Sequence, residues 1–189
     1  MIRPLLAGAA CAVLLAACNQ EQSPEPVDKA QDAMAAPVGQ MSAATMGSNM
    51  QGAYITNAAM GDMYEIQAAD IALEKSQNAR VKELAQMIKT DHTAASNAMK
   101  AMLPQADPEA TPPTALDQRR QGLIDNLRSA SGADFDRVYI DQQIAAHQEA
   151  LTLHRGFSDQ DSPLAAHAKT VVPKIEGHLR MAEQLKEAM

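Results

Sequence analysis

The chain has 189 residues, of which 46% are hydrophobic, 3% are aromatic and none is tryptophan. Its formal net charge of −7, without a basic patch, argues against a nucleic-acid partner, because phosphate backbones bind positively charged surfaces. The abundance of Ala, Gln, Met and Leu favours helices, so an all-helical protein is the first expectation.

Residues 1–17 have the features of an export signal: Arg3 precedes an apolar run that is too short to span a bilayer. The run ends in LLAAC, which resembles the lipobox of bacterial lipoproteins, so we expect cleavage before Cys18 and lipidation of its sulfur. The alternative is a plain secretory signal with an incidental cysteine. Several acyl chains on Cys18 would anchor the protein durably to a membrane. Since Asn19 rather than an aspartate follows, the lipoprotein sorting rule implies the outer membrane of a Gram-negative host, facing the periplasm.

Residues 18–49 are predicted to form the lipidated cysteine and a disordered tether, because Gln, Pro, Ser, Ala, Gly and Met dominate there without sustained periodicity. Methionine thioethers in and beside this segment are soft ligands for Cu(I), although sparse methionine in a low-complexity tail is more often incidental. These residues are Met34, Met41, Met46 and Met50. The folded domain is expected over 50–189.

Four long amphipathic helices and a short one are predicted in that domain, because apolar residues recur every three or four positions. The long helices are expected at about 50–75, 79–103, 134–155 and 163–188, and the short helix follows Thr114. Pro104 is expected to end the second long helix, and Pro173 to kink the last. Short joints make antiparallel hairpins of the first two and the last two long helices, so the fold class is an all-α four-helix bundle with an additional short helix in the long connection.

Polar residues occupy the inner stripes of these helices. His92, His147 and His178 each replace an aliphatic residue in an apolar series, and Glu65 lies at the edge of the first helix's stripe, one turn after Asp62. Counted from the hairpin joints, Glu65 lies at nearly the level of His92, and His147 at nearly the level of His178. The polar groups are therefore expected to face one another near the middle of the bundle.

One carboxylate and three neutral imidazoles form a ligand set suited to Zn, Fe, Mn or Cu, and bundle cores are where such sites are built. The predicted ligands are Glu65, His92, His147 and His178. The alternative is a metal-free polar layer that fixes the register of the helices. Asp91 is expected to orient rather than to bind. His154 and His167, which flank the last joint, are interpreted as exposed polar residues, with an extension of the site as the alternative.

Three segments carry a family resemblance: YEIQAADIALEKSQNARVKELAQMIKTDHTAASN, FDRVYIDQQIAAHQEAL and LAAHAKTVVPKIEGHLRMAEQL. They resemble the bacterial family designated domain of unknown function 4142, described as outer-membrane or periplasmic proteins with a ferritin-like bundle. The likeness covers roughly 53–185 and implies a ferritin-like fold and an envelope location, but no activity. Its motif elements fall on Glu65, Asp91, His92, Phe135, Asp136, Tyr139, His147, Pro173 and His178.

These observations predict a membrane-anchored lipoprotein that binds a metal ion for storage, buffering or envelope stress protection. The alternative is a metal-free structural or interaction lipoprotein with envelope proteins as partners. A hydrolase is disfavoured because no Gly-x-Ser-x-Gly elbow, nucleophilic cysteine, Walker loop or dinucleotide fingerprint is present. A ferritin-type di-iron oxidase is disfavoured as well, since no Glu precedes a His by three residues. The metal's identity and the oligomeric state stay open.

Overall fold

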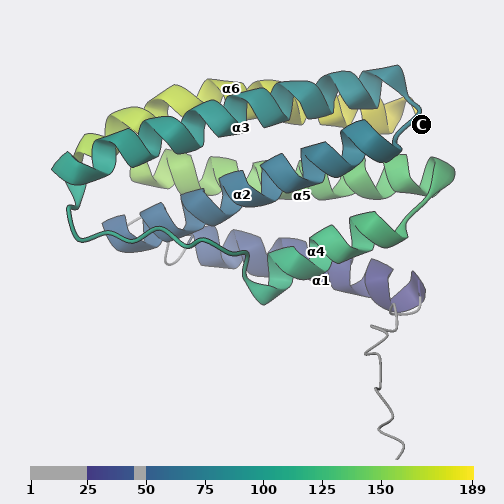
Figure 1. Cartoon of the computed structure of the whole chain (residues 1–189), viewed down its shortest axis with the longest axis horizontal. Coiled ribbons are helices and arrows are strands. Elements are labelled where there is room, and N and C mark those ends of the chain that lie inside the picture. Colours follow the sequence, from purple (N-terminus) through teal and green to yellow (C-terminus); the bar gives the residue numbers. More distant parts are fainter. Residues whose placement is uncertain (1–24, 45–49) are drawn as a thin grey trace, which may run out of the picture.

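Six helices form the described part of the chain, residues 25–44 and 50–189 of a computed structural model (Figure 1). They are α1 (Glu25–Ser42), α2 (Gln51–Lys75), α3 (Ala79–Ala106), α4 (Gln118–Ser129), α5 (Gly132–Phe157) and α6 (Pro163–Glu187). Within these residues there is no strand, which agrees with the predicted all-α class. None of the six helices has an apolar stretch long enough to cross a bilayer.

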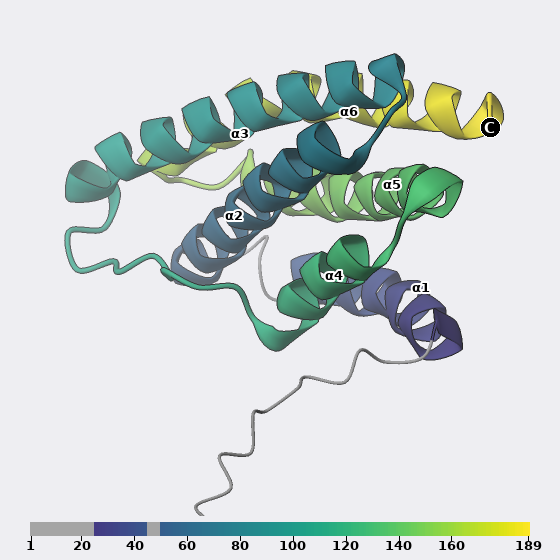
Figure 2. The same ribbon diagram turned by 45° about the vertical axis from the view of Figure 1, so that its right-hand side comes forward.

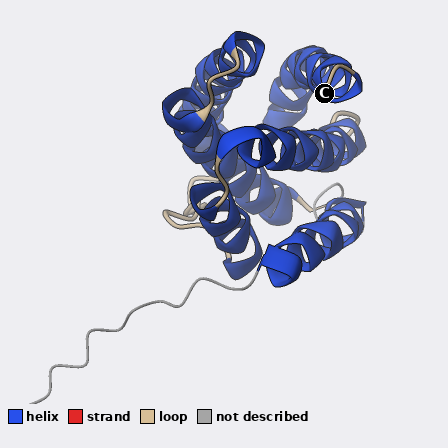
Figure 3. Ribbon diagram, turned by 90° about the vertical axis from the view of Figure 1, so that its right-hand side faces the viewer, coloured by secondary structure: helices blue, strands red, loops and turns tan. Residues whose placement is uncertain are grey.

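The four long helices form the predicted bundle. The hairpin of α2 and α3 packs beside the hairpin of α5 and α6, with α3 against α6 and α2 against α5. Each long helix therefore has two long neighbours, and the four surround one common core, as the end view in Figure 3 shows. The prediction of a ferritin-like four-helix bundle with an additional short helix is confirmed.

Two apolar clusters fill the ends of the bundle. One includes Tyr64, Leu84 and Tyr139, and the other includes Tyr54 and Leu164. Buried alanines on α2 contribute to both clusters and let the neighbouring helices approach closely. His92, His147 and His178 fall between residues of the two clusters along their helices, so they lie in the middle of the bundle.

The structure differs from the predicted disordered tether over Glu25–Ser42, which forms α1. This helix lies beside α4 and α5, on the side of the bundle away from α3 (Figures 1 and 2). Its inner face consists of small residues four apart, Ala35, Gly39 and Ala43, which give almost no hydrophobic signal in the sequence. Gly39 lies so close to Glu149 that a Cβ atom would meet the carboxylate.

Polar contacts also hold α1 in place. Asn126 donates to Asp32 at 2.7 Å, Gln142 donates to the other oxygen of Asp32 at 2.9 Å, and the Thr152 hydroxyl donates to Gln40 at 2.8 Å. The folded part of the chain therefore begins before residue 50. The predicted signal over 1–17 and the lipidated Cys18 lie outside the described residues.

The helix ends differ from prediction at two places. α3 continues through Pro104 to Ala106, since a proline in the last turn breaks only one hydrogen bond. α4 begins after Asp117, whose side chain accepts from the Arg120 N–H, and not after Thr114. Pro173 lies inside α6 without ending it, as predicted.

Candidate metal centre

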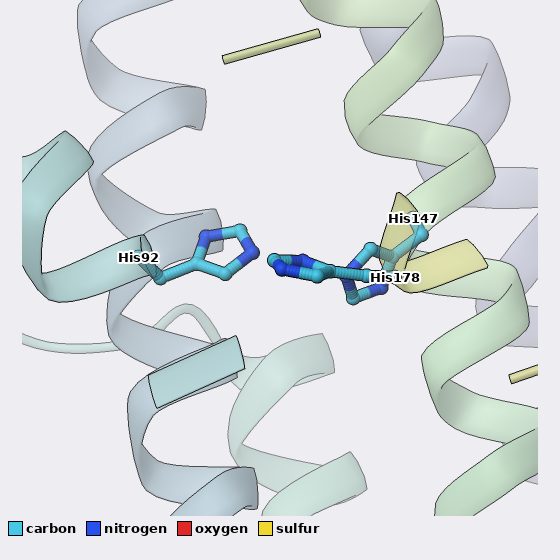
Figure 4. A group of neighbouring side chains, drawn as sticks. All are labelled: His92, His147 and His178. Carbon is cyan, nitrogen blue, oxygen red and sulfur yellow. The ribbon is translucent and has the colours of Figure 1, made fainter. Parts of the chain in front are cut away.

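Three histidines from three helices meet in the middle of the bundle. His92 comes from α3, His147 from α5 and His178 from α6, and all three are buried. One ring nitrogen of each lies within 4.8 Å of those of the other two. Figure 4 shows the rings approaching one another from opposite sides of the core. The structure therefore brings together three of the four residues that the sequence predicted.

Each of these rings is held from behind by an oxygen atom. His92 Nδ1 lies 2.8 Å from Asp62 Oδ1, and His147 Nδ1 lies 2.9 Å from the Gln143 carbonyl. His178 Nε2 lies 3.0 Å from Asp91 Oδ2. Because carboxylate and carbonyl oxygens only accept hydrogen bonds, we assign the proton of each neutral ring to the nitrogen that faces the oxygen. Metal-binding histidines are oriented in this way by the groups behind them.

The remaining nitrogens then present lone pairs to a common centre: Nε2 of His92, Nε2 of His147 and Nδ1 of His178. His92 Nε2 is buried and has no hydrogen-bond partner among the described residues. His147 Nε2 and His178 Nδ1 are 3.2 Å apart. A metal ion with bonds of about 2.0–2.1 Å holds tetrahedral nitrogen ligands about 3.3 Å apart, so this pair already has the spacing of two ligands.

While His147 and His178 are both neutral, their contact and the hydrogen bonds behind them cannot all form at once. For the His147–His178 contact to be a hydrogen bond, one ring must turn its proton inward. That change would leave the Gln143 carbonyl or the Asp91 carboxylate without its imidazole donor. A cation among the three lone pairs removes this conflict.

Glu65 lies behind the centre, not in it. Its Oε1 is 3.5 Å from His147 Nδ1, the nitrogen that already faces the Gln143 carbonyl. The carboxylate does not belong to the group of atoms within 4.8 Å of one another. Its second oxygen, Oε2, is buried without a hydrogen-bond partner among the described residues. The predicted set of four is therefore resolved into three converging histidines and one neighbouring carboxylate.

The surroundings give the ionisable groups of the centre different pKa values. Burial raises the pKa of Glu65 to about 7. Burial and the neighbouring His92 lower the pKa of His178 to about 4, and the pKa of His147 is also lowered, chiefly by burial. Burial opposes protonation of His92 too, but the hydrogen bond and charge of Asp62 raise its pKa above the usual value. His147 and His178 are thus neutral at neutral pH, which is the state that binds metal.

Two aspartates orient the ligands, and the sequence indicated only part of this. Asp91 was expected to orient a ligand, but its partner is His178 on another helix and not the adjacent His92. Asp62 was noted on the inner stripe of the first helix, and the structure places it behind His92. Lys174 also pairs with Asp91. Burial raises the pKa of Asp91, but the hydrogen bonds and charges of Lys174 and His178 outweigh this and lower the pKa below its usual value.

Two small cavities reach the histidines. One of about 40 Å³, with room for a few water molecules, is lined by Glu65 and His92 and, toward α4, by Arg120 and Glu149. Arg120 donates to Glu149 at 2.7 Å, so the arginine charge there is balanced. The other cavity, of about 10 Å³, lies beside His92 and His178 under the Asp91–Lys174 pair. Both cavities border His92, and the smaller one also borders His178.

His154 and His167 are buried, which contradicts the interpretation of these residues as exposed. Each is only 6% exposed, and their rings lie next to each other, edge to face, near the joint of α5 and α6. The sequence contained the signal: His154 follows His147 by two helical turns, and His167 precedes His178 by about three, so each pair shares a helix face.

Comparison with known proteins supports the fold. A crystal structure of a DUF305 fragment from Deinococcus radiodurans has a TM-score of 0.65 and 19% identity, covering 77% of this chain and 99% of that chain. A structure described as CopM in the Cu(II)-bound form has a TM-score of 0.63 and 21% identity, covering 72% of this chain and 95% of that chain. At such identities the likeness shows the fold alone. No curated protein matches the sequence. Residues 36–185 match the family described as domain of unknown function (DUF4142), and the chain therefore belongs to this family.

Proposed function

We propose that this protein binds a transition-metal ion through His92, His147 and His178. The observation that carries the proposal is the orientation of the three rings: each has one nitrogen held by an oxygen from behind and the other directed at a common centre. Such a constellation resembles a tripod of nitrogen ligands with one coordination position left for water or another ligand.

Copper is the metal that we expect. Imidazole nitrogen suits Zn, Cu, Fe and Ni, and among the divalent ions Cu(II) binds most tightly to a given set of such ligands. The fold is shared with a protein whose structure holds Cu(II), which supports the same choice without establishing it. The smaller cavity lies between Asp91 and the two ligands His92 and His178, so we expect the ion to enter from the Asp91 side.

We further propose that the protein is a lipoprotein, anchored through Cys18 in the outer membrane and facing the periplasm, that stores or buffers this metal. The LLAAC segment and Asn19 support the anchor and its location. Protonation of the imidazoles would release the ion on acidification, because a proton and the metal compete for the same nitrogen lone pair. A buffering role follows from such reversible binding.

The alternative of a metal-free polar core has one supporting observation, the 3.2 Å contact between His147 and His178. In that case replacing His147 by leucine would leave the stability unchanged or raise it, because apolar packing often replaces a buried polar layer without loss. The two functions therefore differ in what copper does: only the metal-binding function predicts that copper stabilises the wild type and not His147→Leu.

The test measures copper bound to protein produced without an affinity tag. We expect one equivalent of Cu(II), nitrogen hyperfine structure in the electron paramagnetic resonance spectrum, and a raised melting temperature. His147→Leu should lose these signals while keeping its helical circular dichroism, and Gln148→Ala, an exposed neighbour on the same helix, should keep them. Wild-type protein that stays empty and gains no stability from Cu, Zn, Mn or Fe would refute the proposal.

A further inference from the structure

A second pair of histidines lies near the end of the bundle. His154 is in the last turns of α5 and His167 in the first turns of α6, and their ring centroids are 6.3 Å apart with an angle of 66° between the ring planes. Both residues are more than nine-tenths buried. In the part of the chain that the structure describes, the His167 ring makes no hydrogen bond.

His154 is positioned by a tyrosine. The Tyr54 hydroxyl lies 3.0 Å from His154 Nδ1, and the Tyr54 ring stacks on Phe157 at 3.9 Å between centroids. A phenol can both donate and accept, so Tyr54 is able to hold either tautomer of the neutral His154 ring. When Nε2 of His154 binds an ion, the ring proton can lie on Nδ1 and be accepted by the tyrosine oxygen. Binding at Nε2 therefore needs no net loss of a proton.

We propose that His154 and His167 form a second site, which holds one monovalent soft cation, Cu(I), between their two rings. The centroid separation of 6.3 Å equals that of a two-coordinate ion at which one nitrogen of each ring is directed. In such a linear arrangement, metal–nitrogen bonds of about 2.0–2.1 Å on both sides and about 1.1 Å from each nitrogen to its ring centre add up to roughly 6.3 Å. Zn²⁺ takes four ligands in closed protein sites, whereas Cu(I) accepts two, so a pair of imidazoles selects the monovalent ion.

The surroundings favour a cation. Burial lowers the pKa of His167, and the negative charge of the nearby Asp62 partly offsets this by favouring the protonated ring. The same negative charge attracts a metal ion. Burial, followed by the neighbouring His167, lowers the pKa of His154 to about 3, so its nitrogens stay free of a second proton in all but strong acid.

The second site is separate from the first but connected to it. His154 follows His147 by seven residues of α5, a rise of about 10.5 Å. It lines both cavities that reach His92. A Cu(I) ion held at the end of the bundle would therefore lie next to the space through which the central histidines are approached.

The test titrates the full protein with Ag(I), a redox-inert substitute for Cu(I), in the presence of excess free methionine. The added methionine removes weak binding at the exposed Met34 and Met41. We expect two equivalents for the wild type, one for His167→Leu, one for His147→Leu and none for the double variant. Circular dichroism and melting curves confirm that each variant is folded.

A measurement on the wild type guards against variants that fail to fold. Side-chain ¹⁵N spectra should show silver couplings on His154 and His167. Their absence, or an Ag(I) stoichiometry that His167→Leu leaves unchanged, would overturn the second site. Loss of binding in His167→Leu but not in His147→Leu would refute the central site and support the second, so the two failures are distinguishable.

Discussion

Glu65→Gln isolates the most strongly perturbed carboxyl group in the core. The side chain is 3% exposed, its Oε2 has no partner among the described residues, and burial raises its pKa from 4.5 to about 7. The folded protein therefore holds a proton on Glu65 between about pH 4.5 and 7, where the unfolded chain has already released it. Stability must fall as pH rises through this window, because the native state binds more protons there.

The size of the effect follows from the same numbers. A difference between 4.5 and about 7 corresponds to about 3 kcal/mol of unfolding free energy, at 1.36 kcal/mol for each pH unit. Glutamine is uncharged at every pH, so the variant should lack this loss. Glu65→Gln should thus gain about 3 kcal/mol relative to the wild type between pH 4.5 and pH 8. At pH 4.5 the two proteins should differ little.

Urea unfolding of metal-free protein at several pH values measures this difference. His147 and His178 contribute with the opposite sign, since their lowered pKa values remove stability as pH falls through the usual range near 6.5, whereas the raised pKa of His92 contributes with the same sign as Glu65. Comparison of each variant with the wild type at the same pH cancels that contribution. Glu74→Gln, an exposed glutamate on the same helix, is the control and should show no such trend. A constant difference between Glu65→Gln and the wild type across pH 4.5–8 would show that Glu65 is ionised in the core throughout.

Three further expectations concern the metal site and α1. Asp62→Ala should weaken copper binding about 10- to 100-fold in a competition titration, because His92 loses the acceptor that orients it, whereas Asp70→Ala on the exposed face should not. Copper affinity should fall steadily as pH drops below the raised pKa of His92, because a proton then occupies its ligand nitrogen; a pH-independent Kd between pH 5 and 8 would contradict this. Gly39→Leu should expose α1 to proteolysis, since the new Cβ would collide with Glu149. Gly61→Ala is the control, because its added atom meets nothing, and it should stabilise α2 by up to about 1 kcal/mol. Equal protease resistance of the wild type and Gly39→Leu would refute the packing of α1.

The family comparison constrains the fold more than the chemistry. The chain shares its architecture with a Cu(II)-bound protein and with a DUF305 fragment, at 21% and 19% identity. Bundles of this kind supply inward-facing positions on four helices, and the residues placed there decide what is bound. In the function that we propose for this chain, those residues are the three central histidines and the aspartates behind them.

The sequence by itself determined the long helices and the level of the polar residues along them. Apolar spacing of three and four is a local property, so it located α2, α3, α5 and α6 to within a few residues. Because the joints between hairpin partners are short, counting from them also placed His147 opposite His178, which the structure bears out at 3.2 Å. These are features that one helix, or one hairpin, defines without its neighbours.

Only the tertiary structure decided which atoms meet. The 3.5 Å contact behind His147 excludes Glu65 from the centre, and the Asp91–His178 hydrogen bond joins residues of different hairpins. The α1 helix packs against α4 and α5. Its buried residues are small and give no strong apolar signal in the sequence. The rotation of each helix about its axis, and the groups across the core, set these contacts, and neither is contained in the periodicity of a single segment.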